Sequence, residues 1–234
     1  MTDRDGSDAA LRLDVWADIA CPWCYIGTRH LDAALAVESD EGREVVVRHR
    51  PFELQPTMPP EGLPMRPFFE ARFGGPEAVE GMFERVREVG LSVGIDFDFE
   101  AMPKAPNTRL AHAAVLSYDG DERQRQVLLR LYAAYFEQGL DITDREVLAA
   151  AIAEVTGESP DDIHPRLDDH APLDADLHVA RQLGVDAVPL FVADAGDPDE
   201  DGLGLSAAAI AVSGAQPART LVHLLEQARS RAAG

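Results

Sequence analysis

The chain has 234 residues, of which 46% are hydrophobic and 27% are charged, a balance typical of globular proteins. Its 21 basic and 42 acidic residues give a formal net charge of −21, which disfavours binding to nucleic acid or to an anionic membrane. No apolar run approaches the ~18 residues of a membrane span, and no apolar leader follows the acidic start. We therefore expect a cytoplasmic protein, monomeric or homodimeric, with a disordered tail over residues 1–10.

The first predicted element is a half-buried strand over residues 11–16, where apolar and polar positions alternate and Trp16 falls on the solvent-facing side. The strand leads directly into a Cys-Pro-Trp-Cys motif at residues 21–24. Apolar residues then recur at helical spacing, and proline suits the first turn of a helix because its missing N–H is not needed there. A second strand is predicted over residues 44–49.

From residue 59 onward a proline-rich connection leads into a long region of helical apolar spacing without strand signals. Thr143 and Glu146 form a capping box, and Ser159 precedes a proline and two acidic residues, as at many helix starts. Asn107 is expected to cap a further helix. This part of the chain is therefore predicted to be helical.

Strand signals return near the end of the chain. We predict a short helix over residues 175–183, strands over 185–193 and 208–213, and a final amphipathic helix. The predicted order is strand–helix–strand, a helical insertion, and then helix–strand–strand–helix. This order indicates an α/β protein.

The two cysteines of the chain, Cys21 and Cys24, carry the strongest chemical signal. A thiol at a helix N-terminus lies beside free backbone N–H groups and the positive end of the helix dipole, and both stabilise the thiolate. Cys21 is therefore the predicted nucleophile, and Cys24, one turn further on, the resolving thiol. Zinc would need four ligands, and neither a second cysteine pair nor a suitable histidine pair is present. We expect a redox-active pair, with no metal and no bound cofactor.

Several motifs together resemble those of a known family. They are Cys21-Pro22-Trp23-Cys24-Tyr25-Ile26-Gly27, Arg50-Pro51-Phe52-Glu53-Leu54, Asn107-Thr108 with His112, Val188-Pro189, and Ser213-Gly214-Ala215-Gln216-Pro217. With them the chain resembles the DsbA superfamily of thioredoxin-fold proteins, and more closely its cytoplasmic FrnE-like branch. The resemblance implies a DsbA-like thioredoxin domain over 11–60 and 174–234, interrupted by an all-helical insertion domain over 61–173.

The resemblance also implies roles for residues around the cysteines. Pro189 matches the cis-proline that faces the two cysteines in thioredoxin folds, which would leave the Val188 backbone free to pair with an extended substrate. An ordinary trans-proline at the start of an edge strand is the alternative. Trp23 is expected either to contact the substrate or to pack on the helical domain.

Four further residues or segments have a functional and a structural interpretation. Asp18 is a candidate proton relay for the thiols, although such an acid more often caps a helix or faces water. His112 and His49 are interpreted as core or interface histidines. The segment 197–202 matches the start of a calcium-binding loop, but Ala208 stands where the loop needs a glutamate, so we interpret the segment as a solvated acidic turn.

The leading functional hypothesis is a thiol–disulfide oxidoreductase or isomerase acting on disulfide-containing proteins or small thiols. It would work through a Cys21–Cys24 disulfide, with glutathione or another small thiol as a candidate co-substrate. The first alternative is a glutathione-dependent isomerase or transferase for an aromatic small molecule, as in kappa-class transferases and 2-hydroxychromene-2-carboxylate isomerases, which generally carry serine at the position of Cys21. The second is a chaperone-like peptide-binding protein. The direction of the redox reaction stays open.

Overall fold

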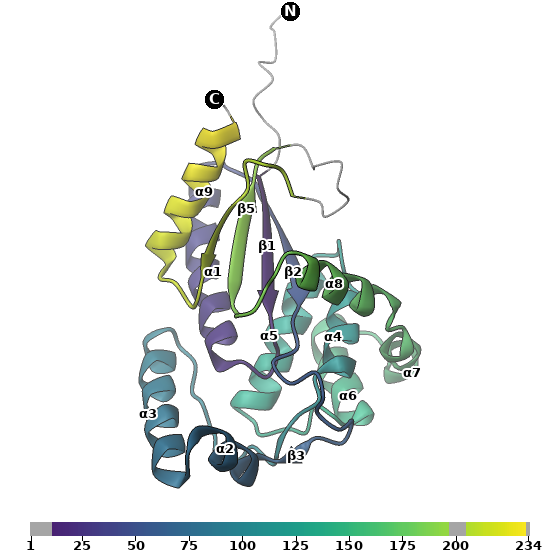
Figure 1. Cartoon of the computed structure of the whole chain (residues 1–234). Helices are drawn as coiled ribbons and strands as arrows, with labels where there is room; N and C mark the ends of the chain where they lie inside the picture. Colours follow the sequence, from purple (N-terminus) through teal and green to yellow (C-terminus); the bar gives the residue numbers. More distant parts are fainter. Residues whose placement is uncertain (1–10, 197–204, 233–234) are drawn as a thin grey trace, which may run out of the picture.

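The computed structural model describes residues 11–196 and 205–232 (Figure 1). The predicted tail over 1–10 and the acidic turn over 197–202 therefore lie outside the described residues. The elements are β1 (Leu11–Ala17), α1 (Pro22–Asp40), β2 (Val45–Pro51), β3 (Leu63–Pro64), α2 (Met65–Phe73), α3 (Pro76–Ser92), β4 (Lys104–Ala105), α4 (Arg109–Leu116), α5 (Arg123–Phe136), α6 (Arg145–Thr156), α7 (Pro160–Ile163), the 3₁₀ turn His164–Asp168, α8 (Ala171–Gln182), β5 (Leu190–Asp194), β6 (Ile210–Ser213) and α9 (Ala218–Ala232).

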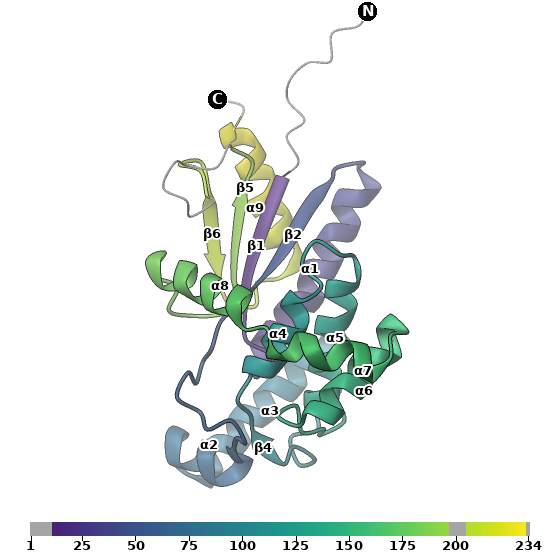
Figure 2. The ribbon, with the colours of Figure 1, turned by 90° about the vertical axis from the view of Figure 1, so that its right-hand side faces the viewer.

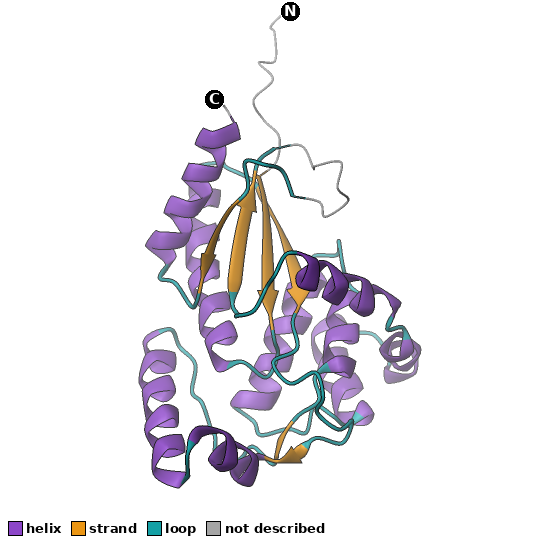
Figure 3. Cartoon of the chain, viewed as in Figure 1, coloured by secondary structure: helices purple, strands orange, loops and turns teal. Residues whose placement is uncertain are grey.

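A four-stranded mixed sheet forms the centre of the upper part of the molecule in Figure 3. Its strand order is β2-β1-β5-β6, with β1 and β2 parallel and the other neighbouring pairs antiparallel. The parallel pair requires a crossover, which α1 provides. The α/β class predicted from the sequence is thus confirmed.

Helices cover both faces of this sheet (Figure 2). Leu31 of α1 and Leu225 of α9 belong to a buried cluster with Leu13 of β1 and Phe191 of β5. On the other face, Ala180 of α8 packs in a cluster with β1 and β5 residues. The sheet is therefore the middle of three layers, and β1 and β2 end at the helical part of the chain below it (Figure 1).

The prediction that one side of β1 faces solvent is wrong. Asp14 and Trp16 are each only 1% exposed, because α8 covers that face. The guanidinium of Arg50 in β2 donates to Asp14 at 2.7 Å and to Asp176 of α8, and it lies 5.9 Å from the centre of the Trp16 ring. Pairing with a buried arginine offsets part of the cost of burying the Asp14 side chain.

The region between β2 and α8 is mostly helical, as predicted. The apolar stripes expected from the sequence face the core in α3, α5 and α6. The short strand pair of β3 and β4 was not predicted, since each strand has only two residues. None of the helices within the described ranges is long and apolar enough to cross a membrane.

Three local predictions need correction. Asp144 caps α6 in place of Thr143, since its side chain accepts from the N–H groups of Glu146 and Val147. Helix α8 begins at Ala171 and not at 175. Strand β5 begins only at Leu190, because the preceding proline has no N–H for the ladder.

The Asn107 prediction is correct only in part: the N-cap residue of α4 is Thr108, but the Asn107 side-chain oxygen accepts from the N–H of Arg109, the first residue of the helix, at 3.0 Å. Its side-chain N–H₂ donates to the Met58 carbonyl at 2.7 Å. This residue thereby ties the start of α4 to the connection that follows β2.

A buried histidine makes the stability of the fold dependent on pH. His49 in β2 is 7% exposed, and burial lowers its pKa from 6.5 to about 4, opposed only in part by the charge of Asp119. Between about pH 4 and pH 6.5 the unfolded chain therefore binds more protons than the folded chain. Stability is complete above about pH 6.5 and falls as the pH falls, by about 3 kcal/mol once the pH is at or below 4.

We expect His49→Gln to lose this component of the pH dependence. The free energy of unfolding, measured by urea denaturation at about pH 7 and pH 4, should fall by about 3 kcal/mol more in the parent than in the variant. His178→Gln, which changes an exposed histidine of α8, is the matched control and should behave like the parent. An identical pH dependence in all three proteins would contradict the assignment.

Candidate active site

The two cysteines lie where β1 ends and α1 begins. Cys21 is the N-cap residue of α1 with extended backbone (φ −99°, ψ 110°), and Pro22 occupies the first turn, as predicted. The N–H groups of Cys24 and Tyr25 donate to the Cys21 carbonyl at 3.0 and 3.3 Å. No side chain caps this helix and its first turn contains no acidic residue. The N-terminal dipole of the 19-residue helix is therefore free to act on the Cys21 sulfur.

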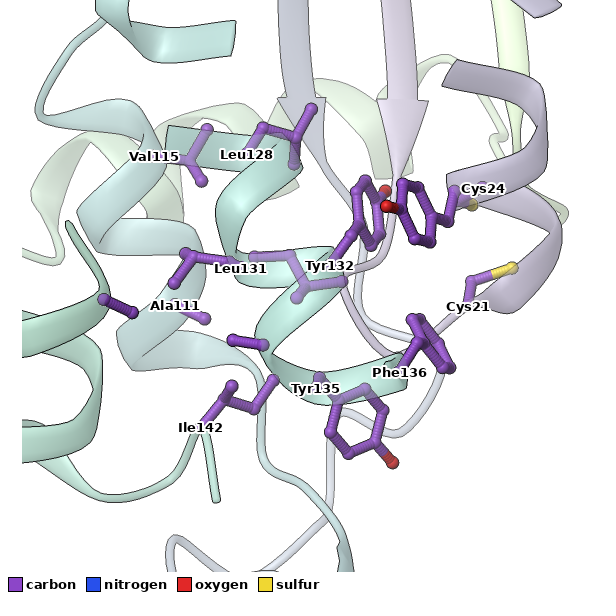
Figure 4. Packing of buried hydrophobic residues seen from close by; sticks show 14 of the residues in the cluster. Cys21, Cys24, Ala111, Val115, Leu128, Leu131, Tyr132, Tyr135, Phe136 and Ile142 are labelled. Carbon is purple, nitrogen blue, oxygen red and sulfur yellow. The ribbon is translucent and has the colours of Figure 1, made fainter. Parts of the chain in front are cut away.

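The surroundings of the two thiols differ. Cys21 is 5% exposed, whereas Cys24 is 1% exposed and packs beside Tyr132 (Figure 4). Burial, followed by the hydrogen bond and charge of Cys21, raises the pKa of Cys24 well above its usual value. Burial also raises the pKa of the Tyr132 hydroxyl. Cys24 is therefore held as a neutral thiol in an apolar environment.

Asp18 is buried beside the thiols and does not face water. Its carboxylate accepts from the N–H groups of Ala20 at 3.1 Å and Leu54 at 2.7 Å, and its carbonyl accepts from the Cys21 N–H at 3.0 Å. The Nε2 atom of His112 lies 3.4 Å from the carboxylate. The charge of Asp18 is one of the causes that raise the pKa of Cys24, so the carboxylate and this thiol are electrostatically coupled.

His112 is a buried histidine, as the sequence analysis proposed. It is 4% exposed, and its Nε2 atom is 3.1 Å from the Phe52 carbonyl. Its position near Asp18 was not predicted, because the two residues are far apart in the sequence. His112 and Asp18 together connect the end of β1 to α4.

Val188 and Pro189 come directly before β5. The Val188–Pro189 peptide bond is cis, as predicted. Val188 and Trp23 line a cavity of about 390 Å³ that also contacts Cys21. Trp23 is half-buried and packs against the core of the helical region, which agrees with the second interpretation given from the sequence; contact with the substrate stays a prediction.

The sequence analysis missed the aromatic wall of this cavity. It comes from α2, α3, α5 and the loop before β4, segments that no local pattern links. The rings that contribute are Phe68, Phe69, Phe73, Phe83, Phe99 and Phe136. The helical apolar spacing predicted for this part of the chain gave no indication that α5 lies beside the cysteines.

Within the described residues, no group of three or more His, Cys, Asp or Glu side chains is placed to hold a metal ion. Cys21 and Cys24 are both unbridged in this structure. Polar groups near the pair include Asp18, the Tyr132 hydroxyl and the Thr28 hydroxyl, which donates to the Cys24 carbonyl at 2.8 Å. The arrangement suits thiolate formation and disulfide exchange.

A family model and similar solved structures agree on the kind of protein that this chain resembles. The family model described as the DSBA-like thioredoxin domain matches residues 12–226. A probable DsbA oxidoreductase from Streptomyces coelicolor is similar in structure with a TM-score of 0.78 and 28% identity, covering 94% of this chain and 90% of that one.

Two more distant structures share the fold. A 2-hydroxychromene-2-carboxylate isomerase has a TM-score of 0.63 and 16% identity, covering 94% of this chain and 95% of that one. The cytosolic disulfide reductase DsbM from Pseudomonas aeruginosa, solved with glutathione, has a TM-score of 0.57 and 20% identity, covering 94% and 96%.

Close packing under Pro189 gives a test of the site geometry. A Cβ atom on Gly27 of α1 would lie 3.1 Å from Pro189 Cγ and 3.3 Å from Phe191 Cζ, whereas one on Gly81 of α3 would meet nothing within 4 Å. Gly81→Ala should stabilise the protein by roughly 0.5–1 kcal/mol, the usual gain in an open helix. Gly27→Ala should instead destabilise it by about 1–3 kcal/mol through overpacking.

Urea denaturation of both variants measures the two changes. The rate of disulfide exchange should fall in Gly27→Ala only, because the Val188–Pro189 segment must move away from α1. Equal stabilisation by both substitutions would mean that Pro189 does not pack on α1 as described.

Proposed function

We propose specific roles for the two cysteines of this chain, which belongs to the DSBA-like thioredoxin domain family. Family membership and the similar oxidoreductase structure identify the chain as a disulfide oxidoreductase. In our proposal the Cys21 thiolate attacks a substrate disulfide and Cys24 resolves the mixed disulfide. The observation that carries this assignment is the contrast between Cys21, at an uncapped helix N-terminus beside a cavity, and Cys24, buried with a raised pKa.

The order of events follows from this contrast. A thiolate is the attacking species, and the N-terminus of α1 stabilises negative charge at Cys21. Cys24 stays protonated until a mixed disulfide forms at Cys21 and removes its negative charge. Since the charge of Cys21 is among the causes that raise the pKa of Cys24, its removal favours ionisation of Cys24 at the moment when it must attack.

Asp18 is proposed to take the proton that Cys24 releases. Its burial and its electrostatic coupling to Cys24 support this role. The two backbone N–H groups that it accepts from hold the carboxylate in one orientation. Trp23 and Val188, which line the cavity next to Cys21, are proposed to contact the substrate.

The proposed partners are disulfide-containing proteins or small thiols, and the compartment is the cytoplasm. The similar disulfide reductase from Pseudomonas aeruginosa is described as cytosolic and was solved with glutathione, which supports a small thiol as co-substrate. Electrons would pass through the Cys21–Cys24 pair. The reaction direction depends on its reduction potential, about −270 mV in thioredoxin and about −120 mV in DsbA.

Alkylation and trapping test the roles of the two sulfurs. Iodoacetamide below neutral pH should modify Cys21 and spare Cys24, because the raised pKa of Cys24 keeps it protonated. Cys24→Ser should accumulate a mixed disulfide with a substrate, detected by mass spectrometry, whereas Cys21→Ser should accumulate none. Equal labelling of both cysteines would contradict the assignment, and trapping by Cys21→Ser would reverse it.

A second measurement tests the redox activity as a whole. The parent protein, equilibrated in glutathione buffers of graded composition, should interconvert between dithiol and disulfide. The midpoint then distinguishes a reductase from an oxidant. A pair that stays in one state across the series would refute the proposed exchange.

Asp18→Asn tests the proton relay. The variant keeps the shape of the side chain but not the base, so we expect exchange to slow on the order of a hundredfold near neutral pH. The deficit should shrink as the pH rises, because solvent hydroxide then removes the proton. A purely structural role predicts lower stability with an unchanged pH profile of the rate, and that result would contradict the relay.

The aromatic cavity also supports a second candidate, an isomerase or transferase for an aromatic small molecule that uses glutathione. The fold shared with 2-hydroxychromene-2-carboxylate isomerase makes this candidate concrete. Such a reaction needs no second thiol at residue 24. Activity that survives Cys24→Ser would therefore favour it over dithiol exchange, and a chaperone-like function would survive the loss of both cysteines.

A further inference from the structure

We propose that the substrate of this site is a small disulfide whose apolar, ring-sized substituent occupies the cavity beside Cys21. This inference rests on the dithiol exchange proposed above and specifies the class of substrate. Its basis is the size, the lining and the charge of the cavity, together with the burial of the nucleophilic sulfur.

The volume of the cavity suits a small molecule. At about 390 Å³ it falls within the range of small-molecule sites, which are mostly apolar clefts of roughly 300–1,000 Å³. Phe83 and Phe99 stack with ring centres 4.2 Å apart in its wall, and Phe69 meets Phe83 edge-on at 5.9 Å. These packed rings form a preorganised aromatic surface against which another ring can pack.

The lining offers little to a charged ligand. Among the described residues that line the cavity, Arg72 and Gln55 are those with a charged or amide side chain. The Arg72 guanidinium lies 5.9 Å from the centre of the Phe73 ring, and the Tyr135 hydroxyl already donates to the Lys104 carbonyl. A carboxylate placed in this cavity would lose its hydration without gaining a full set of partners.

The charge of the whole chain acts in the same direction. A net charge of −21 repels an anionic disulfide such as glutathione disulfide as it approaches. A neutral apolar disulfide meets no such barrier. Charge and lining therefore both favour an uncharged substrate over glutathione disulfide.

The burial of Cys21 favours a small substrate over a protein. Its side chain is 5% exposed, so a substrate sulfur reaches it beside the cavity wall. The outer wall is α2, since Phe68 and Arg72 also line a second groove with Leu63 and Pro67. A small molecule fits within a cavity of about 390 Å³, whereas a folded protein is too large to enter it.

The reaction is a balanced two-electron exchange. The Cys21 thiolate attacks the sulfur that bears the ring, the substrate S–S bond breaks, and the other half leaves as a thiolate. Cys24 then attacks the Cys21 sulfur, forms the Cys21–Cys24 disulfide and expels the ring-bearing thiolate. The protons that Cys21 and Cys24 have given up convert the two thiolates into thiols, so the protein dithiol is oxidised and the substrate disulfide is reduced.

A matched pair of probes tests the substrate class with the full-length reduced protein. Dibenzyl disulfide is compared with its analogue that carries a carboxylate on each ring, and each rate is divided by the rate of that probe with dithiothreitol. We expect dibenzyl disulfide to be reduced about tenfold faster or more, since burial of one ring supplies that much binding free energy. Two further substrates are glutathione disulfide and an unfolded protein whose disulfides have been reduced and then re-formed.

Two variants link the preference to the cavity. Met82→Trp fills it from α3, and Arg85→Trp adds the same side chain on the exposed side of that helix as a control. The dibenzyl preference should be lost in Met82→Trp and kept in Arg85→Trp. If Met82→Trp does not fold, Phe73→Ala replaces it: this residue is 43% exposed, and its loss opens the cavity wall and should lower the preference.

The outcomes separate the substrate class from the proposed function. Rates for the carboxylated probe or the unfolded protein that equal or exceed the dibenzyl rate would overturn the small apolar substrate while leaving dithiol exchange intact. A preference that persists in Met82→Trp or Phe73→Ala would remove the cavity as its origin. Failure to reduce any of the four substrates would instead refute the proposed exchange itself.

Discussion

The turn that joins β1 to α1 is the constraint on which the rest of the structure depends. Its backbone is fixed from two directions: the Cys21 N–H donates to the Asp18 carbonyl, and the Phe52 N–H donates to the Ala17 carbonyl at 2.9 Å. The Asp18 carboxylate adds a bond from the Leu54 N–H. The segment after β2 is thus bound to the residues before the first cysteine, and α1 can begin only where its N-terminus meets the helical part of the chain.

This placement makes two chemically similar thiols unequal. In a chain with 42 acidic residues, the first turn of α1 contains none, so the helix dipole at Cys21 is not opposed by an acid there. Cys24 lies one turn deeper, against Tyr132, which stacks on Tyr25 with ring centres 4.9 Å apart. Desolvation raises the pKa of Cys24 for that reason. The asymmetry needed for ordered exchange is a consequence of depth in the fold.

Sequence patterns predicted the features that depend on neighbouring residues. These features are all local: the strand β1, the position of the two cysteines at the start of α1, and the apolar stripes of α3, α5 and α6. The failures are non-local: Trp16 is buried because α8 returns to cover β1, and Asp14 is tolerated inside because Arg50 pairs with it. The aromatic cavity combines four separated segments, so no spacing rule could indicate it. The domain bounds at 60 and 174 stay a prediction.

A continuous array of rings connects the cavity to the thiols. Phe99 stacks on Phe97 with ring centres 5.3 Å apart, and Phe97 meets Tyr25 edge-on at 6.0 Å, which in turn stacks on Tyr132 beside Cys24. The same buried cluster contains both cysteines and much of the helical region. The cavity wall and the surroundings of Cys24 are therefore parts of one packed cluster, in which a change of volume at one position is felt by its neighbours. The helical region therefore contributes to the candidate site, since it supplies both the aromatic wall of the cavity and the apolar environment that raises the pKa of Cys24.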